Sequence, residues 1–146
     1  MGWPPSCRAT SSRRIACGGS LLQDVEQSST RFIKHDYFPT QGFARDHLAH
    51  EAMVSPNSYL HRVFGGGPIM VNSMHHQGIR RLGDSLAATV HAPDDLIEGI
   101  EGTGESFLVG VQWHPEMLIE QDAGTRRLFT EFREAAEAFA LSGRGA

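Results

Sequence analysis

A histidine and a glutamate stand two residues apart behind an apolar run, and their types and spacing suit general base catalysis. The run, residues 107–111, has the β-branched composition of a buried strand, and Pro115 ends it. On an extended backbone, side chains at positions i and i+2 point the same way, so His114 and Glu116 can face one site. A carboxylate beside an imidazole selects the tautomer and stabilises the imidazolium, which is what a general base requires.

The chain offers two cysteines as the nucleophile that such a base would serve. Cys7 follows Pro4 and Pro5, which forbid a regular strand, and the residues alone favour a thiol in an unstructured tail over a catalytic one. Cys17 precedes Gly18, a placement typical of a small buried residue before a glycine that ends a helix. Either thiol would react only if it were held as a thiolate by a helix amino terminus or an imidazolium.

A second group of polar residues follows a short apolar strand that we predict at residues 68–72. A hydroxyl, two imidazoles and an amide gather there within five positions, in Ser73, His75, His76 and Gln77. This composition favours a hydrogen-bonding site, and the alternative is a polar loop that satisfies its own backbone. The two histidines are adjacent and point to different sides, so one metal ion does not readily take both.

No metal site is expected from the other histidines of the first half of the chain. They are irregularly spaced and no cysteine lies near them, so exposed or rim positions are the simplest interpretation of His35, His47, His50 and His61. The glycine triplet at residues 65–67 has neither the lysine nor the preceding strand of a phosphate-binding loop.

Short strands and one long helix must position these residues. Residues 86–91 and 96–100 flank a Pro-Asp-Asp turn, and this pattern predicts a β-hairpin. Residues 107–112 add a third strand after a glycine-rich turn. Residues 125–141 repeat apolar side chains at helical spacing, so we predict a helix whose apolar side faces the core.

Four separated blocks of the sequence together resemble one enzyme family. They are residues 16–25 (ACGGSLLQDV), 71–77 (VNSMHHQ), 95–101 (DLIEGIE) and 110–116 (GVQWHPE). The chain is similar to class I glutamine amidotransferase-like hydrolases, and within them to the γ-glutamyl-γ-aminobutyrate hydrolase branch, the peptidase C26 family. The resemblance implies an α/β fold, namely part of a doubly wound, mostly parallel sheet with a small antiparallel hairpin and a C-terminal helix.

The resemblance also divides the chain. It implies that residues 15–142 are the C-terminal portion of such a domain, that residues 1–14 diverge and are disordered, and that residues 143–146 are a tail. The abrupt improvement of the match at Ile15 predicts a truncated or frame-shifted reading of a longer gene. Without the preceding strands, a central strand becomes an edge, so we expect aggregation or self-association through that exposed edge.

By resemblance, the chain would hydrolyse a γ-glutamyl amide bond in a small-molecule substrate, as in polyamine (putrescine) catabolism, without a metal or an organic cofactor. The implied roles are Cys7 as nucleophile, His114 as base and Glu116 as the group that orients His114. The implied substrate-binding residues are those of the polar loop: Ser73, His75, His76 and Gln77.

One motif departs from the family pattern. The family places its cysteine in a tight Gly-x-Cys-x-Gly turn, in which small residues relieve crowding around a strained nucleophile. Here Pro5 and Ala9 stand at the two glycine positions around Cys7, and this departure predicts little or no turnover. Two alternatives therefore stay open: a glutamine amidotransferase subunit that passes ammonia to a partner synthase, and a non-catalytic remnant or binding module.

Composition fits one soluble domain of 146 residues. The net charge is −4 and the 13 basic residues are scattered, so no basic stripe indicates a nucleic-acid partner. Two cysteines do not make a disulfide framework, and no apolar run is long enough to cross a bilayer, so neither a membrane partner nor an oxidising compartment is expected. We expect a cytoplasmic protein.

Overall fold

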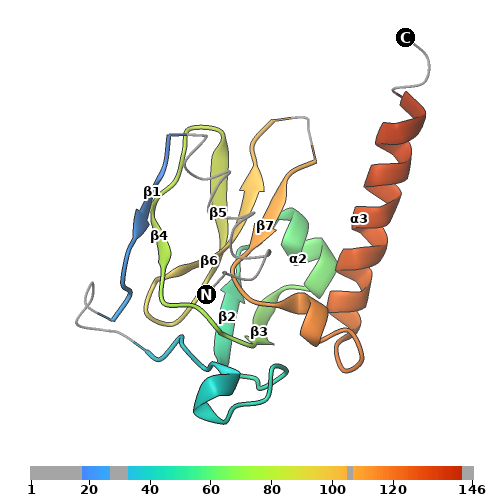
Figure 1. Ribbon diagram of the computed structural model, residues 1–146. Helices are drawn as coiled ribbons and strands as arrows, with labels where there is room; N and C mark the ends of the chain where they lie inside the picture. Colours follow the sequence, from blue (N-terminus) through green and yellow to red (C-terminus); the bar gives the residue numbers. More distant parts are fainter. Residues whose placement is uncertain (1–17, 27–32, 105–106, 143–146) are drawn as a thin grey trace.

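One branched sheet organises the computed structural model, which describes residues 18–26, 33–104 and 107–142 (Figure 1). The strands follow the order β1 (Ser20–Leu22), β4 (Gly78–Arg81), β6 (Ile97–Gly102), β5 (Leu86–His91), β2 (His50–Val54) and β3 (Gly67–Val71). A further strand, β7 (Val109–Val111), pairs with β6 outside this path. The predictions for residues 1–14 and 143–146 concern segments outside the described residues.

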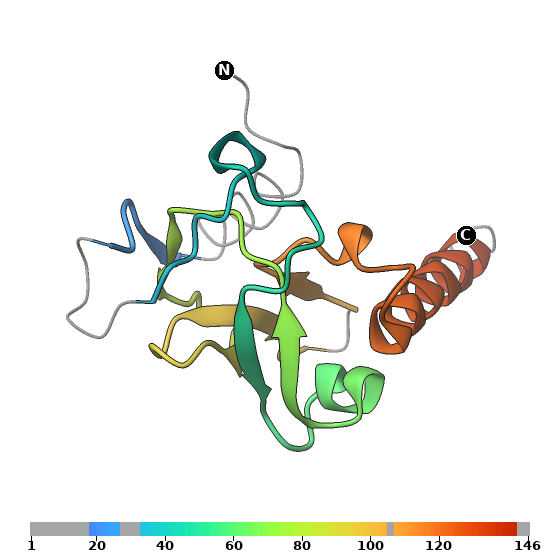
Figure 2. The same ribbon diagram turned by 90° about the horizontal axis from the view of Figure 1, so that it is seen from below.

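The helical segments are α2 (Tyr59–Phe64), α3 (Ala123–Ser142) and the 3₁₀ turns η1 (Pro39–Gln41) and η2 (Pro115–Met117). Helix α3, which confirms the helix predicted at residues 125–141, packs beside α2 at one side of the sheet (Figure 2). Among the described residues, no helix combines the length and the apolar character that a membrane crossing requires.

The α/β character and the C-terminal helix are as expected, but the prediction of a mostly parallel sheet is wrong. All strand pairings among the described residues are antiparallel. Short connections explain the direction of two of these pairings, β5 with β6 and β6 with β7, because parallel neighbours need a crossover of about a dozen residues or more. The predicted hairpin is confirmed as β5 and β6, which pair from Leu86 with Gly102 to His91 with Ile97.

The main core lies between the sheet and the two helices. Strand β2 alternates buried and exposed residues, so Ala52 and Val54 face inward and pack in one cluster with Leu60 and Val63 of α2. The remaining buried members of the same cluster are Val71, Val90, Trp113, Leu118 and Leu128.

The apolar side of α3, predicted to be core, is buried only near its start. Leu128 belongs to the core, whereas Phe129, Phe132 and Phe139 are exposed. The helix runs beside the sheet (Figure 1), and its residues 136–141 are exposed.

Candidate active site and a buried histidine cluster

His114 and Glu116 meet, as their spacing predicts. His114 follows β7, and Pro115 opens the 3₁₀ turn η2, so the two side chains approach through this turn and not along an extended backbone. The distance from His114 Nδ1 to Glu116 Oε1 is 2.7 Å. A carboxylate can only accept, so Nδ1 carries the proton and Nε2 presents a lone pair. The arrangement gives an oriented imidazole that can accept a proton.

Asn72 holds the backbone of this histidine. Its Oδ1 accepts from the His114 N–H at 3.0 Å, and its Nδ2 donates to the His114 carbonyl at 3.1 Å. The same Nδ2 donates to the carbonyl of Arg45 at 2.8 Å. Since Asn72 is itself buried, these bonds satisfy polar groups that water does not reach.

The polar loop after β3 divides into a buried part and a surface part. Ser73 and His75 are buried, and Ser73 Oγ lies 3.1 Å from His75 Nε2 and donates to the His35 carbonyl at 2.9 Å. His76 is exposed, and Gln77 Nε2 donates to Gln23 Oε1 at 3.1 Å. The first two residues thus serve internal hydrogen bonds, as in the alternative of a self-satisfied loop. A substrate-binding role for the four residues stays a prediction.

A pocket of about 240 Å³ borders this loop, and its lining includes His75, His76, His35, Asp36 and Glu26. Cys7 and Cys17 lie outside the described residues, so the structure does not place either candidate nucleophile relative to His114.

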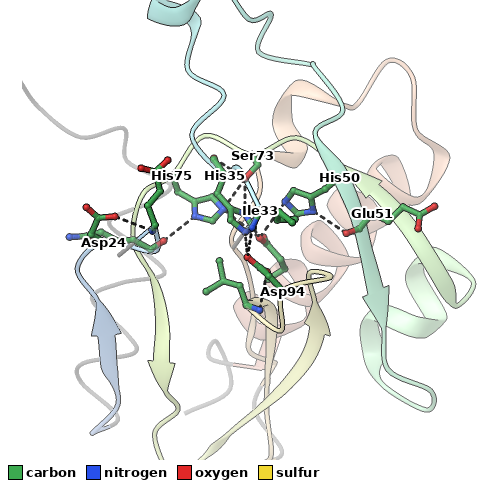
Figure 3. Close-up of polar contacts among 12 residues, drawn as sticks. Asp24, Ile33, His35, His50, Glu51, Ser73, His75 and Asp94 are labelled. Carbon is green, nitrogen blue, oxygen red and sulfur yellow. Dashed lines mark hydrogen bonds and ion pairs between the residues drawn. The ribbon is translucent and has the colours of Figure 1, made fainter. Parts of the chain in front are cut away.

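The structure also gathers a cluster that the sequence does not predict, made of His35, His50, His75, Ser73, Asp94 and Glu98 (Figure 3). Glu98 is at its centre and fully buried. Its Oε1 lies 3.4 Å from His35 Nδ1, 3.7 Å from His50 Nε2 and 3.5 Å from His75 Nε2. At the outer side of His35, Nε2 lies 3.0 Å from Asp94 Oδ2.

Opposing influences set the charges of this cluster. Burial opposes ionisation of Glu98, but His75 and His35 outweigh it and hold the pKa of this carboxyl below its usual range. Burial also disfavours a charged His35, yet Glu98 and Asp94 raise the pKa of this imidazole. At His50 burial prevails over the attraction of Glu98, and its pKa is lowered.

One sequence signal marks this cluster. Glu98 interrupts the otherwise apolar stretch Leu96-Ile97-Gly99-Ile100, and a charged residue inside a buried strand needs a partner. Its histidine partners come from β2, from the segment around residue 35 and from the loop after β3, so their irregular spacing hides them.

Comparison with known proteins gives consistent relatives. The model of the peptidase C26 family matches residues 6–116. Protein NtpR of Enterococcus hirae is 36% identical over 127 residues, which cover 86% of this chain and 52% of NtpR. A Schizosaccharomyces pombe protein named as a glutamine amidotransferase is 39% identical over 126 residues, which cover 86% of this chain and 47% of that protein. The γ-glutamyl-γ-aminobutyrate hydrolase PuuD of Escherichia coli is 29% identical over 133 residues, which cover 90% of this chain and 52% of PuuD.

The chain thus spans about half the length of the curated relatives it matches. Among solved structures, a Thermoplasma acidophilum protein described as a component of GMP synthase matches with a TM-score of 0.61 and 18% identity. The match covers 92% of this chain and 56% of that one, and at this identity it shows a shared fold.

Proposed function

The chain belongs to the peptidase C26 family, and from this membership we propose that it hydrolyses the amide bond of a γ-glutamyl compound. The observation that carries the proposal is the 2.7 Å contact between His114 Nδ1 and Glu116 Oε1. An imidazole oriented by a carboxylate is the base that acyl-transfer enzymes use. The name of the E. coli relative, a γ-glutamyl-γ-aminobutyrate hydrolase, supports the substrate class.

The proposed nucleophile is Cys7. Its sulfur attacks the amide carbon while His114 Nε2 takes the thiol proton, and the same proton then passes to the leaving amine nitrogen. The C–N bond breaks and a γ-glutamyl thioester remains. His114 next takes a proton from water, whose oxygen attacks the thioester carbon, and glutamate and the thiol are released. Glu116 keeps Nδ1 protonated and stabilises the imidazolium in both steps.

A second candidate function is the glutaminase half of an amidotransferase, in which ammonia passes to a partner synthase. The name of the S. pombe relative, a glutamine amidotransferase, favours it. The chemistry at the thiol and imidazole is the same, so the substrates separate the two functions. A free thiol nucleophile persists in a reducing compartment, and the proposal includes the cytoplasm as the location.

The test compares release of glutamate from γ-glutamyl-γ-aminobutyrate and from glutamine by the 146-residue chain and its variants. Because Pro5 and Ala9 replace the two glycines around Cys7, we expect the unmodified chain to turn over slowly. Cys7→Ala and His114→Ala should each abolish the turnover that it shows, and Glu116→Gln should reduce it less. The double variant should be little worse than either single variant because the residues act as a unit. Cys17→Ser and His91→Gln are the matched controls and should retain wild-type rates.

A γ-glutamyl electrophile that alkylates thiols gives an independent measurement. Mass spectrometry should find the label on Cys7 and not on Cys17, and His114→Ala should slow the labelling. Normal turnover in Cys7→Ala would remove Cys7 from the mechanism. Absence of both turnover and Cys7 labelling in the folded chain would contradict the proposed hydrolase and favour a non-catalytic binding module.

A further inference from the structure

The buried histidine cluster contains more hydrogen-bond acceptors than protons. His50 Nδ1 lies 2.9 Å from the Glu51 carbonyl, and His75 Nδ1 lies 3.0 Å from the Gln77 carbonyl. A carbonyl can only accept, so each Nδ1 carries the proton and each Nε2 of a neutral ring presents a lone pair. In His35, Nε2 donates to Asp94 Oδ2 at 3.0 Å, so Nδ1 of the neutral ring presents the lone pair.

These inward-facing nitrogens converge on a carboxylate. His35 Nδ1, His50 Nε2 and His75 Nε2 lie 3.4, 3.7 and 3.5 Å from Glu98 Oε1. Ser73 Oγ lies 3.2 Å from His35 Nδ1 and 3.1 Å from His75 Nε2, but its proton goes to the His35 carbonyl at 2.9 Å. Among the described residues, both oxygens of Glu98 and Nε2 of His50 are buried without a hydrogen-bond partner. Acceptors that face one another in a dry interior repel unless a proton or a metal cation lies between them.

The formal charge of the buried carboxylates indicates that the cluster binds a doubly charged cation. The carboxylates of Asp94 and Glu98 are 2% and 0% exposed. Two buried negative charges require either two imidazolium protons or one divalent cation. The distances of 3.4–3.7 Å from the imidazole nitrogens to Glu98 Oε1 are close to the second arrangement, because metal bonds of about 2.0–2.1 Å in a tetrahedron place neighbouring ligand atoms about 3.3 Å apart.

We propose that His35, His50 and Glu98 bind one divalent transition-metal ion of the zinc type, with His75 beside them as the fourth ligand. One ligand atom from each of the first three residues lies within 4.8 Å of the others, so a small inward movement of the side chains closes the site. Imidazole nitrogens select zinc and its neighbours over magnesium or calcium. The ion would tie β2 and β6 to the loop after β3.

The surroundings of the cluster match those of metal-binding histidines. Each imidazole donates its outer N–H to a carboxylate or a backbone carbonyl, which fixes the tautomer and aims the inner nitrogen at the centre (Figure 3). The pocket of about 240 Å³ lined by His35 and His75 gives an approach, and Asp24, Glu26 and Asp36 line it with negative charge.

The test uses the untagged chain, stripped with a chelator and titrated with Zn²⁺ and then with Co²⁺. We expect one equivalent of either ion, the intense visible bands of low-coordinate Co²⁺, and an increase in thermal unfolding temperature that a chelator reverses. His50→Gln and Glu98→Gln should weaken binding at least about tenfold, and His91→Gln is the matched control that should not.

A measurement on the unmodified chain covers the case in which a variant fails to fold. Imidazole ¹⁵N spectra should show that Zn²⁺ shifts His35 Nδ1 and His50 Nε2 while His91 stays unchanged. A thiolate-to-cobalt charge-transfer band would place the ion on a cysteine and overturn the proposal. Binding of less than one equivalent of Zn²⁺ would also overturn the proposal. So would ¹⁵N spectra in which His35 Nδ1 and His50 Nε2 still carry protons at saturating Zn²⁺.

Discussion

The side-chain amide of Asn72 pairs with both backbone polar groups of His114, accepting from the N–H at 3.0 Å and donating to the carbonyl at 3.1 Å. Asn72 directly follows β3, whereas His114 follows β7, and these strands are not neighbours in the sheet. The pair therefore connects two distant parts of the fold at the proposed base. Since it holds the backbone, it fixes the point from which the imidazole extends.

Asn72→Ala should impair both stability and the proposed hydrolysis. It removes the acceptor that Asn72 gives to the His114 N–H, while the His114 carbonyl keeps its bond from the Met117 N–H at 3.2 Å. The expected cost is about 1–3 kcal/mol in the free energy of unfolding. If Asn72 positions the base, kcat should fall while KM changes little. Asn72→Asp is the informative comparison, because it keeps the acceptor for the His114 N–H but places a buried carboxylate oxygen against the carbonyls of His114 and Arg45. It should therefore be at least as destabilising as Asn72→Ala. Equal kcat values in all three would contradict the positioning role.

Glu101 should stabilise the start of α2 through a long-range cap. Its Oε2 and Oε1 accept from the backbone N–H groups of Tyr59 and Leu60 at 2.8 and 2.9 Å. Glu101→Ala removes two hydrogen bonds to a charged group and should lower the free energy of unfolding by about 1.5–3 kcal/mol. Glu101→Gln retains one acceptor and should cost less, and the exposed Glu120→Ala should be neutral. Denaturant unfolding measures all three, and unchanged amide exchange at Leu60 in Glu101→Ala would refute the cap.

Local patterns in the sequence predict the elements whose partners are close along the chain. The β5–β6 hairpin follows from alternation around a turn, and α3 follows from helical spacing. The contact of His114 with Glu116 follows from a separation of two residues, even though the backbone between them is a 3₁₀ turn. These predictions succeed because the interactions that determine them are local.

Predictions that depend on distant partners fail. The sequence pattern does not predict strand β2, because its first residues, His50 and Glu51, are polar. In the structure His50 nevertheless points inward and contacts Glu98 of β6. An apolar run also does not show whether a strand pairs in the parallel or the antiparallel direction, because both kinds of neighbour bury similar side chains. The histidine cluster exists only after four segments come together, so no spacing along the chain reveals it.

We expect that a residue larger than glycine does not fit at position 99, because β6 approaches β5 closely there. A Cβ at this position would lie 2.6 Å from Val90 Cγ2 and 2.8 Å from Val90 Cβ, closer than real Cβ atoms approach. Gly99→Ala should therefore destabilise the chain by about 1–3 kcal/mol. Val90→Ala removes the closer contact, with Cγ2, but keeps the Cβ at 2.8 Å. The double variant should therefore be somewhat less destabilised than the sum of the two single variants. Strict additivity in denaturant unfolding would show that the backbone absorbs the methyl group without strain.

Exposed aromatic side chains beside β7 should cause self-association of the chain. Phe107, Phe129 and Phe132 are 43%, 39% and 58% exposed and line one apolar groove of about 400 Å³ between β7 and α3. Contiguous apolar surface of this kind is rare on monomers, because burying it against a second copy releases water from it. The groove adjoins β7, so this surface is the place at which we expect the copies to meet.

Sedimentation over a range of concentrations should show reversible association for the wild type and a weaker one for Phe132→Lys. Leu141→Lys is the matched control, because Leu141 is an exposed apolar residue on the same helix but outside the groove. Each large apolar side chain removed from such a contact forfeits about 1.5–3 kcal/mol, which corresponds to roughly a tenfold to hundredfold weaker association. A monomer at all concentrations would contradict this prediction, and equal weakening by Leu141→Lys would move the contact away from the groove.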